Sequence, residues 1–136
     1  MVESVNSLLL QQCKQVLDTT LRGKISKSKK SSDDHMRTSF LSIIELPIDQ
    51  LAYPQYSILI PNLISLSEIR EKLEESSPSC YVSAILFAID FRRVISNFLH
   101  FNWTKDMTNF RTEARNILFL FEEAFEKEFP QICTVS

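Results

Sequence analysis

Apolar residues recur at helical spacing in four stretches of the chain, which predicts four amphipathic helices. The first stretch covers about residues 7–22, with apolar residues at i, i+4, i+7 and i+8 forming one buried face: Leu9, Cys13, Val16, Leu17 and Leu21. Gly23 follows directly, where helices often end on a left-handed residue, so the pattern predicts that the helix ends there.

The other three stretches predict helices over about 65–76, 80–101 and 108–129. In the first of them, Ser65 and Glu68 have the spacing of a capping box. The helix over 80–101 is the most hydrophobic and is expected at the centre of the fold, with one wide buried face: Tyr81, Ala84, Ile85, Ala88, Phe91, Ile95, Phe98 and Leu99. Its apolar surface extends sideways through Phe87 and Val94. The last helix is predicted to bury Phe110, Ala114, Ile117, Leu118, Phe121, Ala124 and Phe125 and to end before Pro130.

The segment 23–64 shows no regular period. Its first half is basic and rich in serine, which predicts a mobile, solvated loop. Its second half, from Phe40 to Ile64, is apolar but interrupted by three prolines, which predicts an irregular loop packed onto the helices. The pattern as a whole predicts an all-α fold, a single domain over 1–136 built as a four-helix bundle with a long loop between the first two helices.

Composition narrows the class of protein. The net charge of −2 is close to neutral, so neither direct DNA binding nor an anionic membrane surface is expected. The three cysteines, Cys13, Cys80 and Cys133, form no C-x-x-C pair, which argues against a disulfide framework or a zinc site and favours a reducing, intracellular compartment. The N-terminal apolar stretch is too short for a membrane span and lacks the basic start of a signal peptide.

The sequence offers no set of catalytic groups. A single glycine excludes the Gly-rich loops that bind phosphates or dinucleotides. His35 and His100 are far apart with no ligand spacing, so neither a metal site nor histidine-based catalysis is expected. We therefore expect a non-enzymatic protein with no catalytic residues, no metal and no cofactor.

The stretch "YVSAILFAIDFRRVISNFLHFN", which begins at Tyr81, resembles the bromodomain pattern "Y-x-x-x-x-x-F-x-x-D-x-x-x-I-F-x-N-C-x-x-Y-N". Its matching positions are Tyr81, Phe87, Asp90, Ile95 (shifted by one), Asn97, Phe101 in place of the family's tyrosine, and Asn102. The resemblance implies a left-handed four-helix bundle that binds acetyl-lysine.

The stretch "YSILIPNLISLSEIREKL" is similar to a second bromodomain pattern, "Y-x-x-I-I-x-x-P-M-D-L-x-T-I-x-x-K-L". The matches are Tyr56, Leu59, Ile60, Leu66, Ile69, Lys72 and Leu73. Leu63 and Ser65 stand where the family has proline and aspartate. The family's Trp-Pro-Phe shelf reads Thr38-Ser39-Phe40 here, so only the phenylalanine is retained.

The resemblance also implies a binding site. Asn102 would donate its side-chain amide to the acetyl oxygen, and Tyr56 would hold a bridging water. The remaining residues expected at the pocket are Phe40, Ile44 or Leu46, Leu51, Tyr53, Phe101, and Thr108 or Phe110 as gatekeeper. Trp103 is expected to supply aromatic surface in place of the missing shelf. A plain helix-capping role for Asn102 is the alternative.

The implied function is that of a monomeric reader of acetylated histone tails or other acetylated nuclear proteins, acting in transcription regulation, in the nucleus, as part of a larger chromatin complex. Its alternative is a divergent bromodomain-like scaffold that has lost acetyl-lysine binding and mediates protein–protein interaction.

Overall fold

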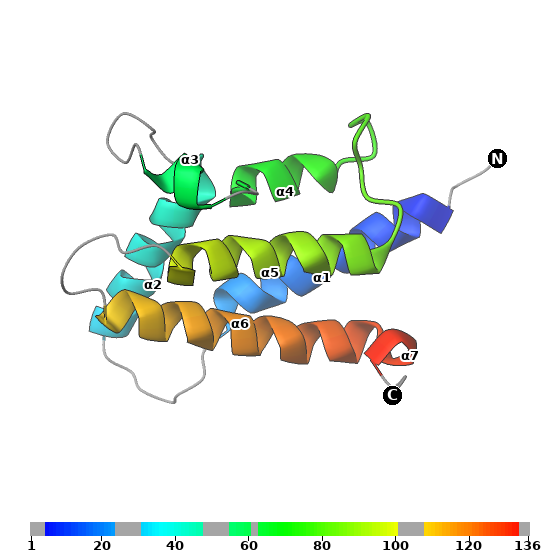
Figure 1. Ribbon diagram of the computed structural model, residues 1–136. Helices are drawn as coiled ribbons and strands as arrows, with labels where there is room; N and C mark the ends of the chain where they lie inside the picture. The colour runs from blue at the N-terminus through cyan, green and yellow to red at the C-terminus, as the bar shows by residue number, and fades with distance from the viewer. Residues whose placement is uncertain (1–4, 24–30, 48–54, 61–62, 101–107, 134–136) are drawn as a thin grey trace.

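The computed structural model describes residues 5–23, 31–47, 55–60, 63–100 and 108–133 (Figure 1). This part of the chain contains no strand, and its helices are α1 (Val5–Arg22), α2 (Ser31–Glu45), α3 (Tyr56–Leu59), α4 (Leu66–Lys72), α5 (Ala84–His100), α6 (Thr108–Glu128) and α7 (Pro130–Cys133). The predicted all-α fold is confirmed. The four stretches with helical periodicity correspond to α1, α4, α5 and α6.

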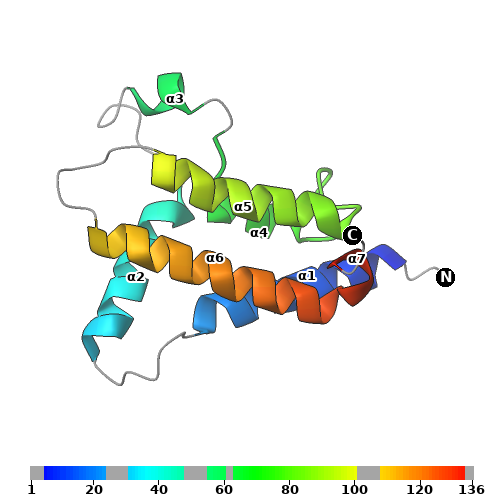
Figure 2. The same cartoon turned by 60° about the horizontal axis from the view of Figure 1, so that its bottom comes forward.

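The four helices α1, α4, α5 and α6 run side by side and form the body of the bundle (Figures 1 and 2). Helix α6 packs against both α1 and α5, and α4 packs on α5. Helix α2 crosses one end of this bundle and packs against α6 and α4. The start of α1 and α7 lie at the opposite end, on the right in Figure 1.

Aromatic rings fill the space between α5 and α6. The ring of Phe121 stacks on Phe91 with a centroid distance of 4.4 Å and an interplanar angle of 15°. The same ring contacts Phe87 at 5.7 Å and Phe125 at 5.6 Å, and all four rings are buried. Burying rings of this size contributes more to a core than any other side-chain type, so α5 and α6 are held together chiefly by this cluster.

Side-chain caps fix where α4 and α5 begin. The capping box is confirmed: the Glu68 backbone N–H donates to Ser65 Oγ at 3.4 Å, and the Ser65 backbone N–H donates to Glu68 Oε1 at 2.8 Å. Helix α5 begins at Ala84 rather than at residue 80, because Ser83 Oγ accepts the Ile85 backbone N–H at 3.1 Å and so caps the first turn.

Helix α2 is the main departure from the sequence-based prediction. The segment 23–64 was expected to be irregular throughout, mobile in its first half and packed onto the helices from Phe40 onwards, yet Ser31–Glu45 is helical. Its apolar residues lie almost entirely in its C-terminal half, where Phe40 and Ile44 are buried one turn apart. Because only that half shows helical apolar spacing, α2 depends on contacts with α6 and α4 rather than on its own pattern.

Arg37 provides a polar contact that joins three helices. Its Nη1 donates to the backbone carbonyls of Leu21 at 3.2 Å and Gly23 at 2.8 Å, and its Nε pairs with the Glu113 carboxylate of α6. The Arg37 and Glu113 side chains are only 15% and 12% exposed. A cation at the C-terminal end of α1 also complements the partial negative charge of the last carbonyls.

The conformation predicted for Gly23 is wrong. Gly23 does not have a positive φ, so it is not the left-handed residue that often ends a helix. A Cβ at this position would lie 3.2 Å from Leu120 Cδ2 and 3.2 Å from the Thr19 carbonyl oxygen. The glycine therefore permits close approach of α1 to α6.

The buried face of α5 is also centred differently from the prediction. Phe87 and Val94, which were expected at its side, are at most 3% exposed, whereas Ile85 is 48% exposed. The buried face thus runs along Phe87, Phe91, Val94 and Phe98. Ile85 belongs to the outer side of the helix.

We expect Arg37→Met to lower the free energy of unfolding by about 2–3 kcal/mol, because it leaves Glu113 and two carbonyls without their partner. Urea unfolding measures this. Arg22→Met is the matched control, since Arg22 is 78% exposed and pairs with Asp18 on the surface, and it should change stability little. Equal stability of Arg37→Met and wild type would contradict the role given to Arg37.

Candidate functional site

The described residues of the predicted site lie at one end of the bundle. The C-terminal end of α5, the start of α6 and α3 gather at this end, on the left in Figure 1, and α2 crosses beside them. Asn102 follows α5 by two residues, since the helix ends at His100. Leu51, Tyr53, Phe101, Asn102 and Trp103 lie outside the described residues, so their roles stay predictions.

Tyr56 is the first residue of α3, and its side chain is also outside what the structure describes. The turn of α3 is closed by local hydrogen bonds, in which the backbone N–H groups of Ile58 and Leu59 donate to the Gln55 carbonyl at 3.2 and 2.9 Å. Exposed apolar side chains occur on this helix and in the connections before and after it: Leu46 at 64%, Ile58 at 78%, Leu59 at 60% and Leu63 at 42%.

Phe40 and Ile44 belong to the core. Phe40 has no exposed surface, and its ring meets Phe98 of α5 edge-on at 4.9 Å with an interplanar angle of 90°. Ile44, one turn later, is 6% exposed. Leu46 lies beyond the end of α2 and points its side chain to solvent, as its 64% exposure shows. Of the two alternatives for the family's valine, Ile44 is thus a core residue and Leu46 a surface residue.

The two candidate gatekeepers lie in the first turn of α6. Thr108 is exposed, and Phe110 is half-buried against the core. Helix α6 begins at Thr108, as the sequence predicts. The gatekeeper role of Thr108 or Phe110 stays a prediction.

Arg111 joins the two helices that flank the Asn102 segment. Its Nη1 donates to the Leu99 backbone carbonyl at 2.6 Å, across a sequence separation of 12 residues. Leu99 is in the last turn of α5, where carbonyls have no partner within the helix. Sequence reasoning missed Arg111, because a single arginine at the start of a helix gives no sign of which carbonyl it reaches.

A buried carboxylate holds α4 against α5. Asp90 Oδ2 accepts from Tyr81 Oη at 2.7 Å and pairs with Lys72 Nζ at 3.0 Å, and Arg93 Nη1 lies 3.6 Å from Oδ1. Lys72 Nζ also lies 5.2 Å from the centroid of the Tyr81 ring. The pKa of Tyr81 is raised far above its ordinary value, mainly by burial and to a smaller extent by the hydrogen bond to Asp90. The phenol therefore stays protonated and donates its proton to the hydrogen bond with Asp90.

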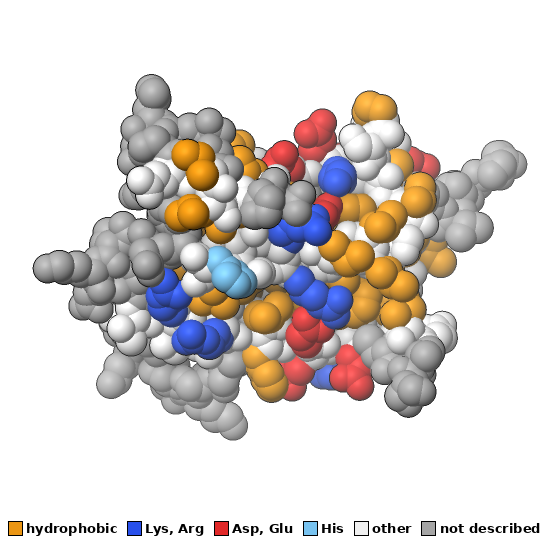
Figure 3. Space-filling view, in the orientation of Figure 1, with side chains coloured by type: hydrophobic (Ala, Val, Ile, Leu, Met, Phe, Trp, Pro, Cys, Tyr) orange, Lys and Arg blue, Asp and Glu red, His pale blue; other side chains and the backbone are white. Residues whose placement is uncertain are grey.

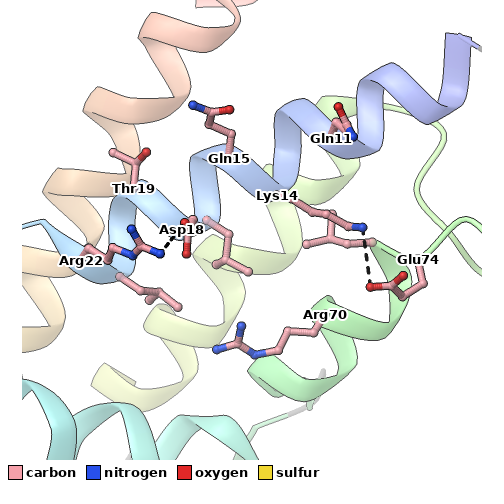
Figure 4. Close-up of a pocket in the computed structure, with 11 residues that line it drawn as sticks. Gln11, Lys14, Gln15, Asp18, Thr19, Arg22, Arg70 and Glu74 are labelled. Carbon is pink, nitrogen blue, oxygen red and sulfur yellow. Dashed lines mark ion pairs between the residues drawn. The ribbon is translucent and has the colours of Figure 1, made fainter.

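A groove in the described part of the chain is separate from these residues. It has a volume of about 780 Å³ and lies between α1 and the α4 region (Figure 4). Its charged side chains are paired: Lys14 with Glu74 at 3.7 Å, Arg22 with Asp18 at 3.1 Å, and Arg70 with Glu45. None of the predicted site residues that the structure describes lines this groove.

Neither a metal centre nor a membrane helix is present among the described residues. No group of three or more histidine, cysteine or acidic side chains there could hold a metal ion. None of the helices in the described ranges combines the length and hydrophobicity that crossing a bilayer requires. Cys13 is buried, and this burial, together with the charge of Glu128, raises the pKa of its thiol to about 12.

The Bromodomain family model matches residues 13–110, which is more than half of the 136-residue chain. The chain belongs to the bromodomain family. Bromodomains are acetyl-lysine reader modules rather than enzymes, and the helical bundle described above agrees with this membership. A search of the curated proteins finds no match for this bromodomain.

The matched positions of this bromodomain fall into two groups. Lys72, Tyr81 and Asp90 meet in the buried cluster that joins α4 to α5. These three residues therefore have a structural role, and ligand binding is not needed to account for them. Tyr56 is the first residue of α3, and Asn102 follows the end of α5 by two residues in the sequence, so both belong to the chain segments next to the predicted site.

We expect Arg111→Met to loosen the last turn of α5, because the Leu99 carbonyl loses its partner. The free energy of unfolding should fall by about 1 kcal/mol. Amide hydrogen exchange at the C-terminal turn of α5 should also become faster, while exchange in the middle of α5 changes less. Arg115→Met, one turn along α6 and exposed, is the control. Unchanged amide hydrogen exchange in the Arg111→Met variant would argue against a stabilising role for the hydrogen bond between Arg111 and the Leu99 carbonyl.

Proposed function

We propose that this bromodomain binds acetyl-lysine at the end of the bundle where α3, the end of α5 and the start of α6 gather. The family match carries the proposal, because it covers residues 13–110 and so includes both Tyr56 and Asn102. Asn102 follows the end of α5 at His100 by two residues in the sequence. That end of α5 is joined to the first turn of α6, because Arg111 donates to the Leu99 carbonyl.

The chemistry of the modified side chain fits such a site. An acetylated lysine ends in a neutral amide, which can enter an apolar hollow if its oxygen receives a hydrogen bond. An unmodified ammonium ion would have to lose its hydration without a compensating charge, at much higher free-energy cost. In the proposal, the Asn102 amide N–H donates to the acetyl oxygen and Tyr56 holds a bridging water.

Apolar side chains near α3 support a peptide-binding role. Leu46, Ile58, Leu59 and Leu63 are each at least 42% exposed in the connection between α2 and α4. Single exposed apolar residues are common, but four within one connection offer apolar surface to the aliphatic part of a modified lysine and to its neighbours in a peptide. Acetylated histone tails and other acetylated nuclear proteins are the proposed partners, which implies a nuclear location and a chromatin complex.

A divergent scaffold that no longer reads acetyl-lysine is the second candidate. Phe40, the retained residue of the family's shelf, has no exposed surface, and the two preceding shelf positions are Thr38 and Ser39. These departures remove aromatic wall from the pocket. The experiment below distinguishes the two candidates, because a scaffold would bind acetylated and unmodified peptides alike or neither of them.

We expect the domain to bind acetylated histone peptides more tightly than unmodified ones, with Asn102→Ala removing the difference. Loss of one hydrogen bond to a buried acceptor costs about 1–3 kcal/mol, or roughly 5- to 150-fold in Kd. Isothermal titration calorimetry with matched peptides measures this. Asn116→Ala, which changes the same residue type farther along α6, is the control. Equal binding by wild type and Asn102→Ala would exclude the proposed role of Asn102.

Trp103 offers an independent readout, because it is the chain's single tryptophan and is adjacent to Asn102. If its ring forms part of the pocket wall, a bound acetylated peptide should quench its fluorescence in a saturable way. The unmodified peptide should leave the emission unchanged. If calorimetry shows binding but the Trp103 emission does not change, the prediction that Trp103 forms part of the pocket wall is wrong. The proposal that the domain binds acetyl-lysine would still stand.

A further inference from the structure

The outer side of α5 carries an apolar ridge on its N-terminal half. The ridge consists of Val82, just before the helix, and Ile85, Leu86 and Ile89, which are 72%, 48%, 46% and 40% exposed. Within α5, Ile89 follows Leu86 by three residues and Ile85 by four, which places these three side chains on one side of the helix, and Val82 lies in the connection directly before it. Figure 3 shows hydrophobic side chains gathered over the start of α5 and the connection before it.

The residues that the structure describes leave this ridge exposed. The opposite side of α5 already buries Phe87, Phe91 and Val94 against the core. A bundle helix normally presents polar residues on the side away from its core. Four branched apolar side chains in one contiguous ridge are instead typical of a surface that binds another protein.

The polarity of the outer side changes along the helix. One turn beyond Ile89, Arg92 and Arg93 follow on the same side, with side chains 45% and 37% exposed. Arg92 pairs with Glu122 at 2.7 Å, and Arg93 shares Asp90 with Lys72. Arg92 and Arg93 thus place two guanidinium groups beside the apolar ridge.

This charge pattern argues against a second copy of the chain as the occupant. Antiparallel pairing of two α5 ridges would bring the arginines toward the N-terminal end of the other α5, where the helix dipole is already positive. Parallel pairing would place arginine against arginine, and like charges face to face are destabilising. An occupant with acidic residues avoids both conflicts.

We propose that the ridge is a docking surface for an amphipathic helical segment of another protein, whose apolar residues recur at the same spacing and whose acidic residues lie beside Arg92 and Arg93. Such helix-to-helix recognition uses a few apolar anchors for affinity and charges at their edge for orientation. The acidic residues fit best in the first turn of an antiparallel helix, since negative charge is favourable at that end.

This surface is distinct from the proposed acetyl-lysine site. The ridge lies at the N-terminal half of α5, whereas Asn102 follows its C-terminal end. The helix has 17 residues and is therefore about 25 Å long. Both surfaces can be occupied at once, and the failure of either proposal leaves the other unaffected.

Titration of two cross-linked helical peptides into the isotope-labelled domain tests the proposal by NMR. Both peptides carry the same leucine ridge, and one has glutamates and the other lysines in its first turn. The glutamate peptide should shift backbone amides of residues 82–93 and bind about tenfold more tightly than the lysine peptide. Higher salt should narrow that difference.

Variants assign the contact to the ridge. Leu86→Ser combined with Ile89→Ser should raise the dissociation constant of the glutamate peptide about tenfold, and Arg93→Gln about threefold. Phe119→Ser is the matched control, because Phe119 is 53% exposed on α6 outside the ridge. Thermal melts confirm that each variant folds.

Three results would overturn the proposal. One is the absence of shifts at residues 82–93 with the glutamate peptide, and another is equal binding of the two peptides. The third is a wild-type dimer in sedimentation equilibrium that the Leu86→Ser, Ile89→Ser variant dissociates, which would assign the ridge to a second copy of the chain.

Discussion

The stacking of Phe91 on Phe121 sets the position of α5, the helix that carries the apolar ridge and precedes Asn102. With the two centroids 4.4 Å apart, the rings lock α5 onto α6 near the middle of both helices. Rotation of α5 about its axis would break the contacts of Phe87, Phe91 and Phe98 at once. The same packing therefore directs the apolar ridge outward and brings the end of α5 to the end of the bundle beside α3.

A buried charge adds orientation that apolar packing alone cannot supply. Asp90 is 8% exposed, and its carboxylate is satisfied only when Tyr81 and Lys72 occupy their observed places. A buried carboxylate without those partners would be costly, so α4 has one favourable register on α5. The ion pair contributes less net stability than its short distances suggest, because desolvation offsets the attraction. Its main effect here is to select one arrangement.

The sequence was sufficient for the elements whose apolar residues repeat over several turns. The four helices were predictable because positions such as Phe91, Phe98, Ile117 and Phe121 keep helical spacing, and the capping box at Ser65 marked the start of α4. Helix α2 was missed because half of its length has no apolar pattern and is anchored by Arg37, whose partner Glu113 lies 76 residues away.

Periodicity was less informative about which apolar side of α5 faces inward. Ile85 and Phe87 are both apolar, and only the packing against α6 decides that Phe87 is buried and Ile85 exposed. For the binding site, the resemblance located Asn102 relative to the helices. Residue spacing could not reveal that Phe40 is in the core or that Arg111 reaches the Leu99 carbonyl, because both depend on three-dimensional contacts.

The dependence of α2 on distant partners has a consequence for the order of folding. Ordering this helix early would require closing a long loop to reach α6, with few local contacts to offset the lost chain entropy. The α1–α5–α6 assembly can form first and then provide the surface on which α2 docks. In the native ensemble, α2 should correspondingly detach as a cooperative unit before the rest of the bundle unfolds. Such an opening would expose Phe98 and change the surroundings of α5 near its C-terminal end.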